Sequence, residues 1–133
     1  MSKKASASRD SSKGISYHIG DLHARVALSK QFIDQNIQSA LHLKDMASKA
    51  HLSEFHFSRV FKKIYNITPY QYFIKKKVEH AAHLIIKTQL PFTAIAYSLG
   101  FKDIHSFSKT FKKIYHTSPT EYRRKKTIHP GQS

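Results

Sequence analysis

The chain has 133 residues, of which 40% are apolar and 12% aromatic, enough for a packed core and too apolar for a wholly disordered protein. It has no cysteine, which excludes a disulfide framework and a thiol nucleophile, and no apolar run long enough to span a bilayer. Twenty-three Lys and Arg against eight Asp and Glu give a net charge of +15, which favours a polyanionic partner and disfavours a catalytic cluster of acids.

Two basic tails are predicted to flank a helical region. Residues 1–20 are rich in Ser, Lys and Ala and offer little to a core, so they are interpreted as a flexible tail, as are residues 127–133. The first helix is predicted after the N-terminal tail, because six apolar residues recur near the 3.6-residue period: Leu22, Val26, Leu28, Phe32, Ile33 and Ile37.

A helix-turn-helix is predicted inside a first subdomain, residues 21–67. A short helix over residues 43–50 is followed by a tight connection, and Ser53 is a good N-cap for a second helix over residues 54–65. The second helix places four apolar side chains toward a core at helical spacing: Phe57, Val60, Phe61 and Ile64. Asn66 suits the left-handed position at its end.

A linker helix is predicted over residues 68–88, where Thr68 and Pro69 form a capped start. About nineteen helical residues span roughly 28 Å, against roughly 34 Å between successive major grooves on one face of B-DNA. The linker is therefore expected to bring two recognition helices to adjacent grooves. Lys75, Lys76 and Lys77 on this helix are candidate phosphate contacts.

An internal repeat with an offset of fifty residues defines a second subdomain, residues 89–126. Residues 57–65 return as residues 107–115, and Pro69 and Tyr72 return as Pro119 and Tyr122. Asp103 is the expected N-cap of the second recognition helix, residues 104–115, and the turn before it is one residue longer than in the first copy. Pro91 and Pro119 are predicted to start the shorter helices.

The exposed stripes of the two recognition helices carry the residue types that contact bases and phosphates. The predicted base contacts are Phe55, Ser58 and Arg59 in the first helix and His105, Ser108 and Lys109 in the second. The predicted phosphate contacts include Lys62, Lys63, Lys112 and Lys113, together with the helix starts at Ser53 and Asp103.

The ordered motifs resemble the AraC/XylS family of transcription regulators. The resemblance rests on Ala47, Ser53, Phe57, Arg59, 61–63, Pro69 and Tyr72 in the first half, and on 95–96, 100–101, Phe107, Lys109, 111–112 and 119–123 in the second. It implies an all-α fold of about seven helices, with two helix-turn-helix subdomains joined by a linker helix. It also implies a regulator, usually an activator, that recruits RNA polymerase at a promoter, and it adds Ile104 to the base contacts. The family often has glycine at Asn66 and His116, and arginine at Lys77.

The sequence also predicts the kind of regulator, its location and its partners. The chain resembles the small stand-alone activators of the family, or a DNA-binding part of a longer regulator with a ligand-binding or dimerisation domain. It is expected to be cytoplasmic and nucleoid-associated, able to act as a monomer, not an enzyme, and without a cofactor or a membrane partner. His80 and His83 lie three residues apart, but no further ligand completes a metal site. A non-specific architectural protein, which binds nucleic acid by charge alone, is the alternative.

Overall fold

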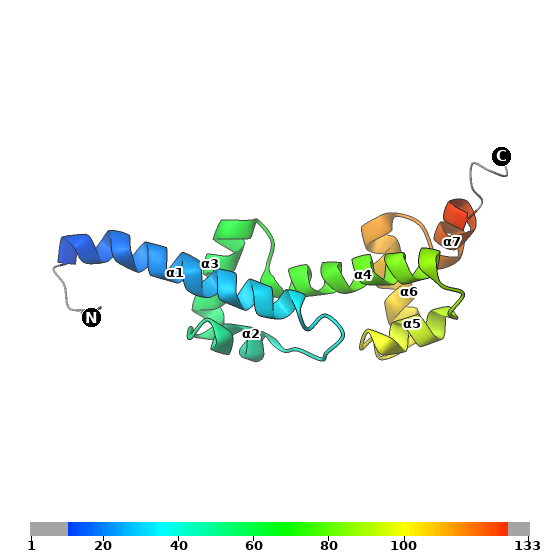
Figure 1. Ribbon diagram of the computed structural model, residues 1–133, viewed down its shortest axis with the longest axis horizontal. Helices are drawn as coiled ribbons and strands as arrows, with labels where there is room; N and C mark the ends of the chain where they lie inside the picture. The colour runs from blue at the N-terminus through cyan, green and yellow to red at the C-terminus, as the bar shows by residue number, and fades with distance from the viewer. Residues whose placement is uncertain (1–10, 128–133) are drawn as a thin grey trace. The chain divides into compact units, whose positions relative to one another are not determined.

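The computed structural model describes residues 11–127, and their side chains from residue 20 to 126. This part of the chain forms seven helices and no strand, so the predicted all-α class and helix number are confirmed (Figure 1). The helices are α1 (Ser11–Asp34), α2 (Leu43–Lys49), α3 (Glu54–Tyr65), α4 (Pro69–Lys87), α5 (Phe92–Ser98), α6 (Ile104–Tyr115) and α7 (Pro119–Thr127). Within the described residues they divide into unit 1, residues 11–32 and 42–69, and unit 2, residues 33–41 and 70–127.

Helix α1 departs from the sequence-based prediction in two respects. It begins at Ser11, so the inner half of the predicted tail over residues 1–20 is helical, whereas residues 1–10 lie outside the described residues. Extending an existing helix adds one hydrogen bond for each residue fixed, which lets a helix run past its apolar stripe. The prediction that Leu28 faces the core is wrong: it is 61% exposed, because it lies about 200° around the helix from the buried Val26.

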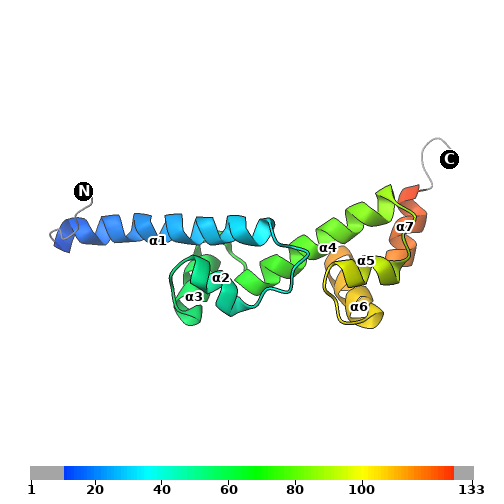
Figure 2. The same cartoon turned by 60° about the horizontal axis from the view of Figure 1, so that its bottom comes forward.

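Unit 1 packs α2 and α3 against α1, an arrangement visible from two directions (Figures 1 and 2). Phe57 and Phe61 of α3 are fully buried, with their ring centroids 5.6 Å apart. Met46 of α2 is fully buried, and its carbonyl accepts a 2.7 Å hydrogen bond from the buried hydroxyl of Ser29. The buried Ser29 hydroxyl therefore has a partner, as a buried polar group requires.

Unit 2 has a core of nine buried residues contributed by α4, α5, α6 and the turn that follows α5: Val78, Ala81, Ala82, Ile85, Ile95, Ala96, Leu99, Phe107 and Phe111. Aromatic rings extend this core. The ring centroids of Phe111 and Tyr122 in α7 are 5.3 Å apart, and those of Phe107 and Phe101 are also 5.3 Å apart. The predicted core positions Phe107 and Phe111 are confirmed, and Ile114 is partly buried against the same cluster.

The internal repeat includes α1 and α4, which the sequence match at an offset of fifty residues does not pair with each other. The buried residues Val26 and Ile33 of α1 correspond to the buried Val78 and Ile85 of α4 at an offset of fifty-two. A basic residue precedes each valine. Its side chain donates a hydrogen bond to the C-cap carbonyl of a short helix, α2 in unit 1 and α5 in unit 2. Arg25 donates to the Ala50 carbonyl (2.8 Å), and Lys77 donates to the Leu99 carbonyl. Carbonyls at a helix C-terminus lack partners within the helix and carry partial negative charge, so both cations stabilise the turn.

Lys77 is therefore not a phosphate contact, and that prediction is wrong. The residue is 4% exposed, and its ammonium group also donates to the carbonyls of Ile37 (2.6 Å) and Ser39 (3.0 Å). These bonds use all three ammonium donors inside unit 2. Lys77 ties residues 37–39 to α4 and to the turn between α5 and α6.

Burial lowers the pKa of Lys77 from 10.5 to about 8, and a measurable pH dependence of stability follows. Below pH 8 the folded and unfolded chains both hold this proton. Between pH 8 and about 10.5 the unfolded chain holds more of it, so the free energy of unfolding rises with pH. We expect an increase of roughly 2 kcal/mol between pH 7.5 and pH 9.5, measured by urea unfolding.

The matched control is Lys77→Arg, whose guanidinium stays charged throughout this range. The increase should be absent from this variant. An equal increase in both proteins would show that another group causes it.

Candidate nucleic-acid interface

Each recognition helix is fixed at both ends by a local cap. The Ser53 hydroxyl accepts a hydrogen bond from the His56 N–H (3.1 Å), and the Asp103 carboxylate accepts one from the Ser106 N–H (2.7 Å). This bond lowers the pKa of Asp103. Both predicted N-caps are therefore confirmed.

The C-terminal ends of the two recognition helices also match. Asn66 and His116 close α3 and α6 in the left-handed conformation, with φ of 61° and 62°. The predicted C-cap of α3 is confirmed. Histidine adopts this conformation less readily than asparagine, yet its N–H still donates to the Lys112 carbonyl (2.7 Å), as that of Asn66 does to the Lys62 carbonyl (2.8 Å).

We expect Ser53→Ala to lower the free energy of unfolding by about 1 kcal/mol, because the His56 N–H loses its acceptor. Urea unfolding measures the change. Ser53→Asp keeps a capping oxygen and should retain most of the stability. An alanine variant as stable as the unmodified protein would contradict the role given to this hydroxyl.

The two turns of the helix-turn-helix units share one hydrogen-bond pattern and differ in length. The Leu52 N–H donates to the Ala47 carbonyl (3.1 Å) and the Phe101 N–H to the Ala96 carbonyl (3.0 Å). Four residues separate α2 from α3 and five separate α5 from α6, so the predicted one-residue difference is confirmed. Gly100 has φ of 83°, a left-handed conformation that other residues rarely adopt, so glycine suits this position.

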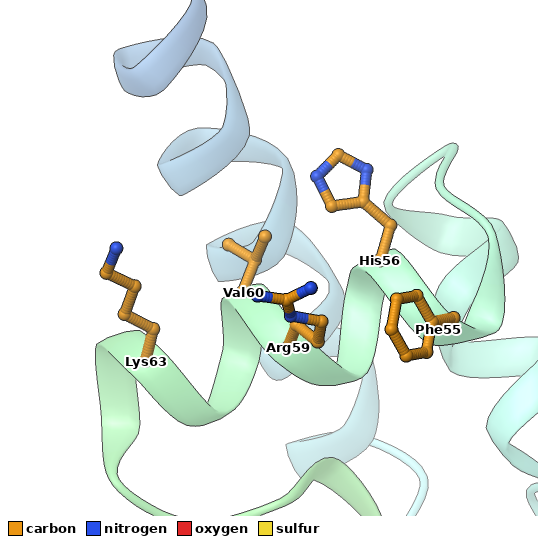
Figure 3. Close-up of a pocket in the computed structure, with 5 residues that line it drawn as sticks. All are labelled: Phe55, His56, Arg59, Val60 and Lys63. Carbon is orange, nitrogen blue, oxygen red and sulfur yellow. The ribbon is translucent and has the colours of Figure 1, made fainter.

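The outer face of α3 carries an aromatic ring paired with a guanidinium. Phe55 is 71% exposed, and the guanidinium carbon of Arg59 lies 5.4 Å from its ring centroid. Figure 3 shows both side chains on the same side of the helix, one turn apart. Ser58 lies between them in sequence and is half-buried. The expected exposure of Phe55 and Arg59 is therefore confirmed.

Two shallow hollows border this pair. The first, about 410 Å³, is lined by Phe55, His56, Arg59, Val60 and Lys63 (Figure 3). The second, about 490 Å³, adds Ser58, Lys62 and Thr68 to Phe55, Arg59 and Lys63. His56 was not among the predicted contacts, although its place in the first turn of the recognition helix is a signal that sequence reasoning had available.

The outer face of α6 is chemically different at the matching positions. His105 and Lys109 are exposed and Ser108 is half-buried, so these predicted contacts are accessible at least in part. Ile104 is half-buried and packs against the core of unit 2. Only the outer part of its side chain remains for a base contact, because the rest stabilises the fold.

The predicted phosphate contacts fall into three groups. Lys62, Lys63, Lys112 and Lys113 are exposed at the C-terminal halves of α3 and α6. Lys75 and Lys76 instead face Glu79, with nitrogen–oxygen distances of 4.0 Å and 3.3 Å. A phosphate at α4 competes with this carboxylate. At Asp103 the capping carboxylate itself is an anion, so only the backbone N–H groups around it favour phosphate.

The histidine pair of α4 is the remaining candidate feature from the sequence. The rings of His80 and His83 stack with centroids 6.4 Å apart, and His80 lies 3.5 Å from the Gln38 amide. Among the described residues, no three His, Cys, Asp or Glu side chains are grouped so that they could hold a metal ion. Over the same part of the chain, no helix is both long and apolar enough to cross a membrane.

Known proteins with the same helix-turn-helix architecture match this chain. Residues 46–125 match the helix-turn-helix domain family. The C-terminal domain of AraT, a response regulator from Geobacillus stearothermophilus, is 34% identical, with a TM-score of 0.74 over 80% of this chain and 88% of that domain. The chain belongs to the AraC family of helix-turn-helix proteins. Its membership confirms the resemblance seen in the sequence and agrees with the prediction that it is not an enzyme.

Other AraC-type proteins match over the same region. The C-terminal domain of the response regulator yesN from Fusobacterium nucleatum is 32% identical, with a TM-score of 0.69 over 73% of this chain and 95% of that domain. The probable transcriptional regulator LumQ of Photobacterium leiognathi is 34% identical over 76 residues, 57% of this chain and 31% of LumQ. The chain covers between 24% and 36% of the lengths of the curated relatives that it matches, so the similarity concerns the AraC-type DNA-binding domain alone.

Proposed function

We propose that this chain binds a specific double-stranded DNA site and regulates transcription from it. The observation that carries the proposal is the pair of capped recognition helices, each with one exposed basic side chain, Arg59 or Lys109, in its first two turns. Basic side chains at these positions of a helix-turn-helix contact base edges in the major groove. The net charge of +11 over residues 54–126 supplies the attraction to phosphates.

We assign base contacts to the outer faces of α3 and α6. Phe55, Ser58 and Arg59 read bases from α3, and His105, Ser108 and Lys109 read bases from α6, with Ile104 in a minor role. The exposed lysines at the ends of these helices contact phosphates, and Lys75 and Lys76 do so after they leave Glu79. Two reading helices in one chain make a monomer sufficient for a non-palindromic site.

The relatives support a regulatory role. One is the lactose operon transcription activator of Staphylococcus xylosus, 32% identical over 72 residues. A solved structure of the AdpA DNA-binding domain holds a target DNA, and at 21% identity it shares the fold, with a TM-score of 0.70. We infer by extension an activator that acts at promoters through RNA polymerase, in the cytoplasm with the nucleoid. The chain serves either alone or as the DNA-binding part of a longer regulator.

Selection of bound duplexes from a random DNA pool tests the proposal. The expected result is an enriched site of about 20 base pairs with two different conserved blocks one helical turn apart. Strong, salt-sensitive binding without an enriched sequence would overturn it in favour of an architectural protein that binds by charge. A promoter carrying the enriched site upstream of a reporter then distinguishes activation from repression.

A further inference from the structure

Phe55 and Arg59 form a preassembled unit on α3. The two side chains are one helical turn apart, and the guanidinium carbon lies 5.4 Å from the ring centroid, within the range of a cation–π contact. The contact holds a long, flexible side chain close to one conformation before any ligand is bound. An arginine that is already positioned loses less conformational entropy when it binds.

The exposure of Phe55 requires an explanation. A ring that is 71% exposed stabilises the monomer little, and four other phenylalanines of the recognition helices are fully buried. The cation–π contact uses part of the ring, and the remainder borders the hollow lined by Ser58, Lys62, Lys63 and Thr68. An apolar edge at the mouth of a basic hollow fits a ligand that presents an apolar group beside phosphates.

Double-stranded DNA presents one apolar group of this kind in the major groove, the C5-methyl of a pyrimidine. Guanine is the base that arginine recognises there with two hydrogen bonds, to O6 and N7. Because the ring and the guanidinium are in contact, the groups they meet must be neighbours in the DNA.

We propose that Phe55 and Arg59 act as one reader of a two-base-pair step, in which a pyrimidine C5-methyl lies next to a guanine. The ring contacts the methyl, the guanidinium pairs with the guanine, and the stacking between them couples the two preferences. Thymine supplies this methyl, and 5-methylcytosine supplies the same group. Phe55 is then a specificity-determining residue that senses methylation at this step.

The matching positions of α6 provide an internal comparison. His105 and Lys109 replace the ring and the guanidinium, and they offer an imidazole and an ammonium instead of an apolar face and a planar fork. The proposed coupling therefore belongs to the block of the site that α3 reads. The block read by α6 is the control sequence within the same duplex.

The inference rests on the proposed function, and the test begins from the selected site. Each thymine in the block lost in Arg59→Ala is replaced in turn by deoxyuridine, which removes only the methyl group. The full chain should lose about fourfold in affinity at the thymine next to the guanine, the value of one buried methyl group, and nothing measurable at thymines of the other block. Where the site tolerates cytosine at that position, 5-methylcytosine should bind more tightly than cytosine by a similar factor.

Two variants complete the test. Phe55→Ala should abolish the sensitivity to deoxyuridine and weaken the preference for guanine. His105→Ala removes a proposed contact to the other block, so it should lower the overall affinity but leave both of these preferences in the α3 block intact. Unchanged affinity for the deoxyuridine duplexes, or equal losses in Phe55→Ala and the unmodified protein, would overturn the inference while the proposed function stands. Failure to enrich any site would instead overturn the proposed function itself.

Discussion

Phe107→Ala is expected to lower the free energy of unfolding by about 3–5 kcal/mol, the cost of truncating a fully buried aromatic ring. The ring is fully buried in the core of unit 2, where its centroid lies 5.3 Å from that of Phe101 and 5.9 Å from that of Phe111. Its removal leaves a cavity among side chains from α4, α5 and α6, and the surrounding structure relaxes only partially to fill it.

Urea unfolding followed by circular dichroism measures this change. The matched control is Phe55→Ala, which removes the same atoms from a side chain that is 71% exposed and should alter stability by less than about 0.5 kcal/mol. Similar losses in the two variants would mean that Phe55 belongs to the core. The separation of the core aromatics from the exposed ring that we propose contacts DNA would then fail.

The affinity for DNA is expected to fall about a thousandfold between 50 mM and 200 mM salt. Six lysines are proposed phosphate contacts, and each neutralised phosphate contributes roughly 0.9 to the slope of log affinity against log salt. Four of them, Lys62, Lys63, Lys112 and Lys113, are exposed at the ends of the recognition helices.

Single Lys→Gln substitutions distinguish lysines that contact phosphate from lysines that are paired with a carboxylate, through the change each causes in the salt slope. Lys63→Gln or Lys113→Gln should reduce the salt slope by about 0.9. Lys76→Gln should reduce it less, because Glu79 lies 3.3 Å from the Lys76 nitrogen and already offsets its charge. The control is Lys87→Gln, which removes an exposed charge at the end of α4 that has no proposed role. Equal changes in all four variants would indicate general charge attraction and no defined contacts.

The features that the sequence predicts well are those set by neighbouring residues. A serine or aspartate before an amphipathic run defines a helix start, and Ser53 and Asp103 accept the N–H bonds expected of them. The spacing of Phe57 and Phe61, repeated at Phe107 and Phe111, identifies the buried faces of both recognition helices. The exposed stripes, and with them most of the candidate contacts, follow from the opposite faces.

The features that the sequence predicts poorly depend on distant parts of the chain. Lys77 sits among other lysines on a helix that appears polar there, and its burial follows from carbonyls at Ile37, Ser39 and Leu99 that only the fold brings together. The exposure of Leu28 differs in origin, because its angular distance from Val26 on the same helix could be read from the sequence. Ile104 is a base contact only by resemblance, and its packing against the core of unit 2 depends on residues distant in the sequence that the fold brings to it.

We propose that each helix-turn-helix reads its own block of one DNA site. The most direct test repeats the selection from random duplexes with Arg59→Ala and with Lys109→Ala, whose side chains are exposed and whose loss should not disturb folding. The predicted result is that each variant loses sequence preference in one block, a different one in each case, and keeps the other. The same enriched site from both variants and the unmodified protein would contradict the assignment of these helices as the readers.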